Sequence, residues 1–337
     1  MSHILQRIIA GVVVALLLWA GLWGYGYYYD HRKPNFERNA VLYIYPGMTA
    51  ETVMDSVRTK AGVLNAESLS RTFSDVTPRP GRYEIAPSMT SAALARKIEK
   101  GWEDEMSLTV APVFRYPADV AELMGAQLMI SPEDIRTALE DKDFLSGYGF
   151  TPETALALIL PDTYRVRWSI GVKELFDRLK KEYDRYWNDG RRAKAAAQGL
   201  TPVEAAILAS IVNEETKYQP EMAKVAGVYL NRLHSKGWLL QADPTVSYCF
   251  DYKLTRVLNR HLEVDSPYNT YKYEGLPPGL ISCAPKACIE AVLNPSSEAN
   301  YFFCASPALD GTHRFARTGA QHAANARAYQ AALSRLK

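Results

Sequence analysis

The feature that most constrains how this chain can fold is an uncharged run near its N-terminus. The run extends over 22 residues, from Ile8 to Tyr29, and is rich in Val, Leu and Ile. As a helix it would span roughly 33 Å at about 1.5 Å per residue, which matches the hydrocarbon thickness of a bilayer. Trp and Tyr gather at its C-terminal end, as in an aromatic belt. We therefore expect one transmembrane helix.

The residues that flank this run indicate whether the segment is cleaved off and in which direction it crosses the membrane. No A-x-A-like cleavage site follows it, so we expect an uncleaved single-pass anchor, with residues 1–30 forming a cytoplasmic tip and the span. Arg7 precedes the run while Arg32 and Lys33 follow it, a weak bias against an outward C-terminus. Long domains can cross regardless of such charges. On the strength of the later motifs we place the remaining residues outside the inner (cytoplasmic) membrane, in the periplasm or its equivalent.

Length and charge limit the remaining function classes. A chain of 337 residues can hold two or three domains with real cores. A net charge of +2, without a long Lys/Arg block or an RNA-binding signature, gives no reason to expect a nucleic-acid partner.

Four cysteines lie in the last third of the chain: Cys249, Cys283, Cys288 and Cys304. Outside the cytoplasm they can form one or two disulfides, and three pairings exist for four cysteines. A C-x4-C spacing without nearby His pairs is a poor zinc signal. We expect neither a metal site nor a cofactor.

A short polar linker and a small repeated module follow the anchor. Residues 31–37 form the linker, and residues 38–106 contain two apolar runs that are each followed by P-x-M-T, at positions 46–49 and 87–90. In each copy the Thr is placed to cap a helix, and Gly101 is a helix stop. The strand-turn-helix order resembles the LysM carbohydrate-binding repeat, although Met48 stands where that repeat usually has Asp. A packing or spacer module is the alternative.

Residues 107–337 predict a larger domain that mixes helices and strands. Ser131 is a helix cap with Glu133 and Asp134 in the first turn. Residues 171–198 have the pattern of one amphipathic helix, and further helices follow Thr201 and Ser282, with short strands between them. The expected class is α+β, with an N-terminal transmembrane helix, the LysM-like module and this larger domain.

The helix that begins after Thr201 carries an acid where an apolar side chain is expected. Thr201 and Glu204 form an S/T-x-x-E capping box around Pro202. At roughly 100° per residue, Glu215 falls within about 20° of the mean direction of the apolar side chains. Glu214 lies about 90° away and is expected to face water.

Burial of Glu215 would have a chemical consequence. A desolvated carboxylate has a raised pKa and stays protonated near neutral pH, as a general acid must. In the alternative interpretation the helix ends near Glu215 and the acids of the segment are solvated.

Polar blocks surround this helix in the sequence. They are P-D-T-Y at 161–164, V-Y-L-N-R-L at 228–233, L-Q-A-D-P-T-V at 240–246, and S-P-Y-N-T-Y at 266–271, which leads to G-L-P-P-G at 275–279. Together with A-S-I-V-N-E-E-T at 209–216, these ordered blocks resemble the endolytic murein transglycosylases, the MltG/YceG-like family. The resemblance covers nearly the whole chain, including a terminal H-x-F with a further His, here His313, Phe315 and His322.

The resemblance implies a role for Glu215. In that family the helix block usually reads A-S-I/L-I/V-E-x-E, and the second glutamate is the catalytic acid, which maps to Glu215. Asn213 replaces the first glutamate. The implied reaction cleaves the β-1,4 bond between N-acetylmuramic acid and N-acetylglucosamine inside a strand, leaving a 1,6-anhydro end. Glu215 would act first as the general acid and then as the base on the C6 hydroxyl.

Other residues of the blocks are candidates for binding the glycan. Gln241 and Asn269 can orient acetamido and hydroxyl groups without a charge cost, and Tyr268 and Tyr271 can flank a sugar ring or simply pack. We also assign substrate binding to four further polar residues of these blocks: Asn231, Asp243, Asp162 and Tyr164.

Asp243 and Asp162 also define a rival mechanism. Ordinary glycosidases generally need two carboxylates, so either residue could make the protein a lysozyme-like hydrolase. In such a turn-like segment an Asp more often stabilises the turn than takes part in catalysis, and for Asp243 we favour this structural role over a catalytic one. His313 and His322 can serve as acid–base groups or satisfy local hydrogen bonds, and Ser210 lacks a G-x-S-x-G elbow.

The expected partners follow from the resemblance. Peptidoglycan strands are the implied substrate, an anchor would hold the enzyme where new strands emerge, and association with peptidoglycan synthases is implied by the family alone. A peptidoglycan-binding scaffold without catalysis is the remaining alternative.

Overall fold

The computed structural model describes residues 3–335, which divide into two compact units. The first unit holds the residues up to Ser107 together with Arg165–Ile170, and the second holds Leu108–Tyr164 and the residues from Gly171 onward. The expected boundary lay between residues 106 and 107, and residues 165–170 were expected in the larger domain. The chain mixes helices with three short two-stranded sheets in its described part.

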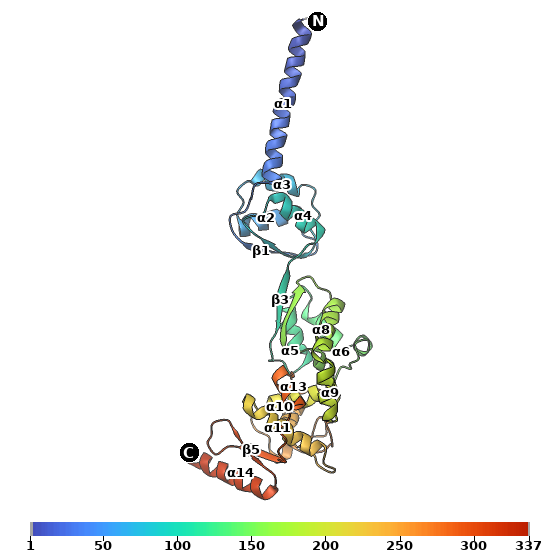
Figure 1. Ribbon diagram of the computed structural model, residues 1–337, viewed down its shortest axis with the longest axis vertical. Coiled ribbons are helices and arrows are strands. Elements are labelled where there is room, and N and C mark those ends of the chain that lie inside the picture. Colours follow the sequence, from blue (N-terminus) through green and yellow to red (C-terminus); the bar gives the residue numbers. More distant parts are fainter. Residues whose placement is uncertain (1–2, 336–337) are drawn as a thin grey trace. The chain divides into compact units, whose positions relative to one another are not determined.

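The N-terminal apolar run forms helix α1, His3–His31, and none of its side chains is buried. Within residues 3–335 it is the only single helix that is long and apolar enough to cross a membrane (Figure 1). Two later helices reach that length only together, across a bend of 72°. At the end of α1, Asp30 forms an ion pair with Arg71 at 2.9 Å, which ties α1 to its unit.

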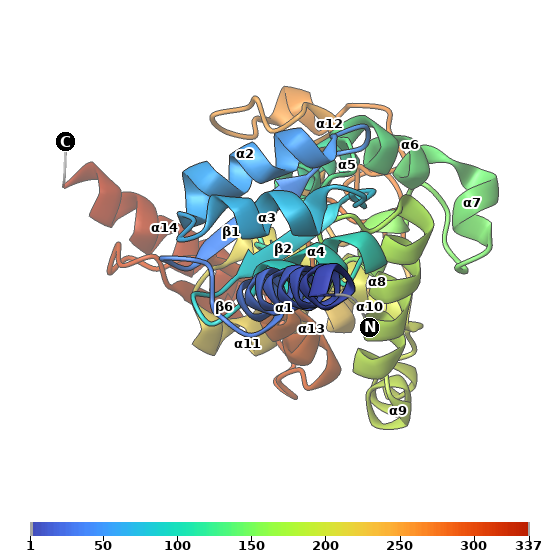
Figure 2. The same cartoon turned by 90° about the horizontal axis from the view of Figure 1, so that it is seen from above.

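The first unit is a small sheet covered by helices. Its elements are β1 (Ala40–Ile44), α2 (Ala50–Ala61), α3 (Ala66–Phe73), β2 (Gly81–Ile85) and α4 (Ser91–Lys100). Strands β1 and β2 are antiparallel, with Leu42 opposite Tyr83. Alternate strand residues such as Leu42 and Ile44 are fully buried against Val53, Leu69 and other apolar side chains of the helices. Figure 2 shows α2 and α3 side by side.

The two P-x-M-T copies have the same local structure, which explains the repeat. Thr49 caps α2 and Thr90 caps α4, each by accepting a backbone N–H three residues on. Met48 and Met89 each accept a backbone N–H through Sδ from the residue three positions before. Gly101 ends α4 at φ +67°, a conformation that favours glycine. Both predicted caps and the predicted stop are therefore confirmed; glycan binding by this module stays a prediction.

Strand β3 (Glu105–Val110) pairs with β4 (Asp162–Arg167), and the chain passes between the two units along these strands. The second unit then contains α5 (Pro117–Gly125), α6 (Pro132–Glu140), α7 (Lys142–Ser146) and the 3-10 helix η1 (Ala155–Leu158). Ser131 caps α6 as predicted, accepting from the N–H of Asp134 at 3.1 Å.

The segment predicted as one amphipathic helix is two helices, α8 (Val172–Tyr186) and α9 (Asp189–Ala197). Asn188 accepts the N–H of Arg191 at 3.0 Å and so begins a new helix, while the preceding Trp187 is buried. The prediction of a single helix was wrong because a cap in mid-segment outweighed the continuing apolar pattern.

Helix α10 (Pro202–Glu215) lies at the centre of the second unit. It packs against α11 (Gln219–Leu233), α12 (Asp243–Cys249) and α13 (Lys286–Leu293), and every residue from Ala205 to Asn213 is buried. The predicted capping box is present, with Thr201 and Glu204 each bonding the other's backbone N–H. The 3-10 helix η2 (Asn259–His261) lies in the long loop between α12 and α13.

The chain closes with a hairpin and a helix. Strands β5 (Phe302–Ala305) and β6 (His313–Ala316) are antiparallel, with Phe303 opposite Phe315, and α14 (Gly319–Ser334) packs on them. Figures 1 and 2 both show α14 at the edge of its unit, away from α8 and α9.

Candidate active site

Glu215, the last residue of α10, lies in a pocket of about 400 Å³. Besides Glu215 itself, four parts of the second unit supply the wall. They are α11, the loop around the start of α12, the loop between residues 262 and 285, and the terminal hairpin with α14. The lining residues are Glu215, Tyr229, Arg232, Gln241, Asp243, Tyr271, Phe302, Phe303 and His322.

A larger hollow of about 650 Å³ lies at the opposite end of α10. Its wall includes Thr201, Glu204 and the Gly275–Pro278 stretch of the G-L-P-P-G block. The carboxylate of Glu204 is already engaged in the capping box. We regard the Glu215 pocket as the better candidate because its titratable groups are strongly perturbed and are not engaged in capping.

The environment of Glu215 favours its protonated form. Burial raises the pKa of Glu215 from 4.5 to about 7; the hydrogen bond from Tyr229 lowers the pKa and the nearby charge of Asp243 raises it. The hydroxyl of Tyr229 donates to Oε1 of Glu215, and burial raises the pKa of that phenol well above 10. A pKa of about 7 favours the protonated form of Glu215 at pH values below 7, which is the direction expected for a desolvated carboxylate.

The prediction for Glu214 was wrong. Its side chain is only 11% exposed, and its carboxylate forms an ion pair with Nη2 of Arg115 at 2.8 Å instead of facing water. The helical wheel failed because it assumes one buried face, whereas α10 is buried on all sides. The guanidinium of Arg115 also stacks on the ring of Tyr252, 4.1 Å from the centroid.

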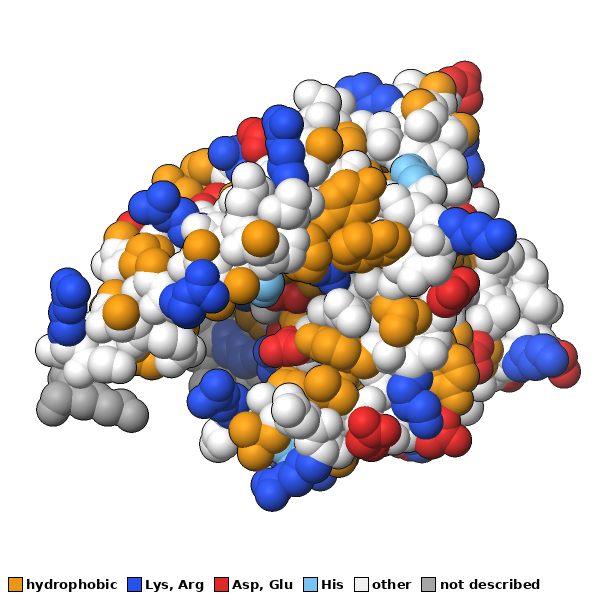
Figure 3. Space-filling view, turned by 90° about the horizontal axis from the view of Figure 1, so that it is seen from below, with side chains coloured by type: hydrophobic (Ala, Val, Ile, Leu, Met, Phe, Trp, Pro, Cys, Tyr) orange, Lys and Arg blue, Asp and Glu red, His pale blue; other side chains and the backbone are white. Residues whose placement is uncertain are grey.

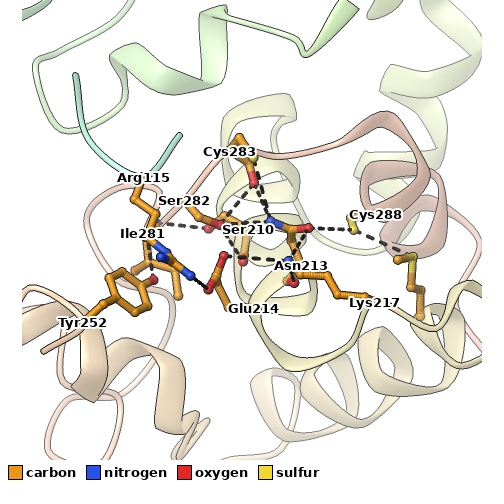
Figure 4. Close-up of polar contacts among 11 residues, drawn as sticks. Arg115, Ser210, Asn213, Glu214, Lys217, Tyr252, Ile281, Ser282, Cys283 and Cys288 are labelled. Carbon is orange, nitrogen blue, oxygen red and sulfur yellow. Dashed lines mark hydrogen bonds and ion pairs between the residues drawn. The ribbon is translucent and has the colours of Figure 1, made fainter. Parts of the chain in front are cut away.

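Asn213 anchors the same helical turn on another side. Its Nδ2 donates to Oγ of Ser282 at 3.3 Å and to the carbonyl of Cys283 at 3.4 Å, while its Oδ1 accepts from Lys217 at 3.1 Å. Figure 4 shows Asn213 between Cys283 and Cys288, with Glu214 directed toward Arg115. A neutral amide at this position makes donor and acceptor contacts that a carboxylate cannot both make.

Asp243 and Tyr271 form a second polar group on the pocket wall. The hydroxyl of Tyr271 donates to Oδ1 of Asp243 at 2.5 Å. Gln241 precedes them with φ +51°, held by its N–H bond to the carbonyl of Thr270 at 3.0 Å. This uncommon backbone conformation brings both Gln241 and Asp243 to the pocket.

Arg232 supplies a buried positive charge at the pocket. Its Nε donates to the carbonyl of Tyr301 at 2.7 Å and its Nη1 to the carbonyl of Leu240 at 2.6 Å. The guanidinium thus joins α11 to β5 and to the loop that carries Gln241. Burial lowers the pKa of Arg232, and within residues 3–335 it has no carboxylate partner in an ion pair.

Three predicted substrate-binding residues lie outside this pocket, in structural hydrogen bonds or ring contacts. Asn231 donates to the carbonyls of Glu298 and Asn300. Asn269 is fully buried and bonds the backbone of its own loop. Tyr268 packs against Tyr248 with the rings tilted by 37° and their centroids 4.6 Å apart.

Asp162 and Tyr164 lie around a different hollow, of about 200 Å³. The carboxylate of Asp162 is paired with Lys286, and the buried hydroxyl of Tyr164 donates to the carbonyl of Leu160. Of the nine predicted site residues, the pocket therefore brings together Glu215, Gln241, Asp243 and Tyr271.

Five pocket residues were absent from the predicted site: Tyr229, Arg232, Phe302, Phe303 and His322. Tyr229 is 14 positions from Glu215, on the next helix, so spacing alone does not signal their contact. His322 stacks on Phe302, and its Nδ1 is buried without a hydrogen-bond partner in the described residues. The terminal H-x-F followed by a histidine was the one sequence signal that pointed to this wall.

The remaining titratable candidates lie elsewhere. His313 pairs with Glu221, with Nδ1 2.8 Å from Oε2. The four cysteines are free thiols, and burial raises the pKa of Cys283 to about 11 and that of Cys288 to about 12.

Comparisons with known proteins agree with this architecture. An endolytic murein transglycosylase of Bacillus subtilis (strain 168) is 32% identical over 191 residues, which are 56% of this chain and 48% of that protein. A protein of the same name from Streptococcus pneumoniae (strain D39) is 24% identical over 345 residues, 90% of this chain and 62% of that protein. The chain thus spans about half to three fifths of the length of these relatives.

A solved structure and a family model extend the comparison. The crystal structure of a yceG-like protein from Listeria monocytogenes has the same fold, with a TM-score of 0.56 and 23% identity, over 85% of this chain and 98% of that one. The model of the YceG-like family matches residues 42–328. Because that match runs from strand β1 into helix α14, this chain belongs to the YceG-like family.

Proposed function

We propose that this protein is an endolytic lytic transglycosylase that cleaves the β-1,4 bond between N-acetylmuramic acid and N-acetylglucosamine within peptidoglycan strands. The observation that carries the proposal is Glu215, a carboxylic acid with a pKa of about 7 in a pocket of sugar-binding size. The names of the two relatives support the same reaction.

In the proposed first step, Glu215 donates its proton to the bridging oxygen as the C1–O4 bond breaks. Tyr229 occupies Oε1, which leaves Oε2 to carry that proton. The departing N-acetylglucosamine hydroxyl takes the proton, and positive charge develops on the muramyl ring.

In the second step, the resulting Glu215 carboxylate removes the proton from the C6 hydroxyl of the same muramyl residue, and the C1–O6 bond forms. The product end is 1,6-anhydro-muramic acid, Glu215 is again protonated, and no water is consumed. One carboxylate suffices because the nucleophile belongs to the substrate.

The other pocket groups suit this chemistry. Asp243 bears its negative charge on the same wall and would stabilise the developing positive charge, with Tyr271 fixing its orientation. Gln241 presents an amide to acetamido and hydroxyl groups, and the Phe302 and Tyr271 rings offer faces to sugars. Helix α1 would anchor the enzyme in the inner membrane, close to emerging strands, with its two units on the outer side.

The test is mass spectrometry of products from uncrosslinked peptidoglycan treated with the full chain in detergent. Glu215→Gln is compared with the native chain, and Glu214→Gln is the matched control one position away. We expect internal fragments with 1,6-anhydro ends from the native chain and the control, and none from Glu215→Gln. Loss of the 1,6-anhydro fragments with Glu214→Gln but not with Glu215→Gln would contradict the assignment of Glu215 as the catalytic acid.

A hydrolase is the second candidate, and the observation that favours it is Asp243, a second carboxylate on the pocket wall. Hydrolysis in heavy-oxygen water would give reducing muramic acid ends that carry the label. A binding scaffold would give no product from any of the three proteins.

A further inference from the structure

The C-terminal segment that forms one wall of the pocket is strongly basic. From Gly311 to Arg335 the sequence contains no Asp or Glu, and its arginines are Arg314, Arg317, Arg327 and Arg335. All four side chains are exposed, and none forms an ion pair with a carboxylate of residues 3–335. Among the other exposed arginines of the second unit, Arg136 and Arg185 are paired, whereas Arg256 and Arg260 have no ion pair within residues 3–335.

These arginines belong to the same elements as the pocket residues. Arg314 is paired in register with Cys304, next to Phe303, which lines the pocket. Arg317 lies between β6 and the N-cap of α14. Arg327 follows His322 by five residues on α14, about 7.5 Å along the helix and roughly 140° around it. The unpaired guanidinium of Arg232 continues the positive charge into the pocket. Figure 3 shows a hollowed face of the molecule with several Lys and Arg side chains around the hollow.

Two acids lie close to this segment, and neither forms an ion pair with its arginines. Glu221 bonds His313, with Oε2 2.8 Å from Nδ1, and Asp310 lies near enough to Arg314 for the arginine's charge to lower the pKa of Asp310. Asp310 directs Oδ1 to the N–H and hydroxyl of Thr312, at 3.0 and 2.6 Å, instead of pairing with an arginine. The charges are therefore available to a ligand.

The composition of α14 argues against a membrane as that ligand. A helix that lies in a bilayer interface presents large apolar side chains opposite its charged face. Within residues 319–334, the exposed side chains are Ala, Gln, Ser and Arg, whereas the large apolar side chains Tyr329 and Leu333 are half-buried.

We propose that this arginine surface, Arg314, Arg317 and Arg327, binds the carboxylates of the peptide substituents on the glycan strand. The inference rests on the proposed function and specifies its substrate: strands that still carry their peptides. The sugars themselves offer hydroxyl and acetamido groups, whereas peptide carboxylates match the planar fork of a guanidinium. Exposed pairs of this kind weaken with salt, because the Debye length falls from about 10 Å at 0.1 M to about 3 Å at 1 M.

The test compares two substrates and two matched triple variants of the full chain in detergent. One variant combines Arg314→Gln, Arg317→Gln and Arg327→Gln. The control combines Arg96→Gln, Lys142→Gln and Lys181→Gln, three exposed cations that have no ion pair within residues 3–335. The substrates are uncrosslinked strands with peptides and the same strands after an amidase has removed them.

We expect the arginine variant to lower the ratio of kcat/KM for peptide-bearing over peptide-free strands several-fold, mainly through KM. The control should keep the native ratio, and added salt should lower the native ratio toward that of the arginine variant. An unchanged ratio, or an equal change in the control, would overturn the inference. Binding of the same three proteins to vesicles that contain an anionic lipid is measured alongside. An arginine variant that keeps the native ratio of kcat/KM but loses this vesicle binding would also overturn the inference.

Failure of the proposed function can be told apart from failure of this inference. If the native chain cleaves neither substrate, binding of fluorescent peptide-bearing strands is measured instead, with native chain and both triple variants. Salt-sensitive binding that only the arginine variant loses would support the arginine surface without the reaction. Equal binding by all three proteins would reject it.

Discussion

The phenolic hydroxyl of Tyr229 donates a hydrogen bond to Oε1 of Glu215, although the two residues are 14 positions apart and lie on successive helices. Two effects on Glu215 oppose each other at this contact: desolvation raises its pKa, while the hydrogen bond from Tyr229 lowers it. The balance sets the pH at which the candidate acid is still protonated.

The pH dependence of cleavage follows from that balance. The first proposed step needs the protonated form of Glu215, whose pKa is about 7. We expect kcat/KM to fall above pH 7, approaching tenfold per pH unit. Initial rates on uncrosslinked strands between pH 5 and 9 measure this, and a rate that keeps rising above pH 8 would exclude Glu215 as the acid.

Tyr229→Phe should move the basic limb of the pH profile, where kcat/KM falls, to higher pH. Without the hydroxyl, the carboxylate loses the hydrogen bond that lowers its pKa, so Glu215 stays protonated to higher pH. We expect the basic limb of kcat/KM to shift to higher pH, and the rate at pH 6 to fall because the acid is less well oriented. If the basic limb stays at the same pH, the Tyr229 hydrogen bond does not control the pKa of Glu215.

Asp243→Asn should move the limb the other way, because the charge of Asp243 raises the pKa of Glu215. If Asp243 only stabilises charge, the variant keeps 1,6-anhydro products at a rate lowered by about 100- to 1,000-fold, the range for one electrostatic group. Tyr271→Phe is the control, since it frees Asp243 without removing its charge. Complete loss of product, with labelled reducing ends from the native chain, would favour the hydrolase.

The unfolding free energy should also report on Glu215. Its pKa is raised in the folded protein, so the folded state binds the proton more tightly, and stability falls as the pH rises from 4.5 through 7. Between pH 4.5 and pH 7 the native chain should therefore lose unfolding free energy relative to Glu215→Gln, by at most roughly 3 kcal/mol. Thermal unfolding of both proteins at pH 5 and pH 8 measures it. A difference that is constant with pH would contradict the raised pKa.

The sequence predicts local features of this molecule better than its long-range contacts. The caps at Thr49, Thr90 and Thr201 depend on residues within four positions, and all three form as predicted. The wall made by Phe302 and His322 depends on how the terminal hairpin and α14 pack, and no local pattern encodes that packing.

Asn231 and Asn269 show a related limit. They stand in polar blocks, yet their amides satisfy backbone carbonyls of loops. A polar residue in a motif can either contact a ligand or fix the loop that does, and sequence position alone does not separate these roles.

The last prediction concerns Glu214, the neighbour of the candidate acid. Glu214→Gln removes the charge that pairs with Arg115 but keeps a side chain of similar size. Because Arg115 is 45% exposed, water compensates part of the loss, and we expect a cost of roughly 1–2 kcal/mol in unfolding free energy.

Catalysis should respond much less, since Glu214 does not line the pocket. The loss of this ion pair should lower the melting temperature by a few degrees. The basic limb of the pH profile should move only slightly to lower pH, because the charge of Glu214 raises the pKa of Glu215 less than burial or the charge of Asp243 does. Arg115→Gln should reproduce the effect, and the double variant should cost less than the sum of the two single variants. A loss of activity at 25 °C as deep as that of Glu215→Gln would instead place Glu214 in the chemistry.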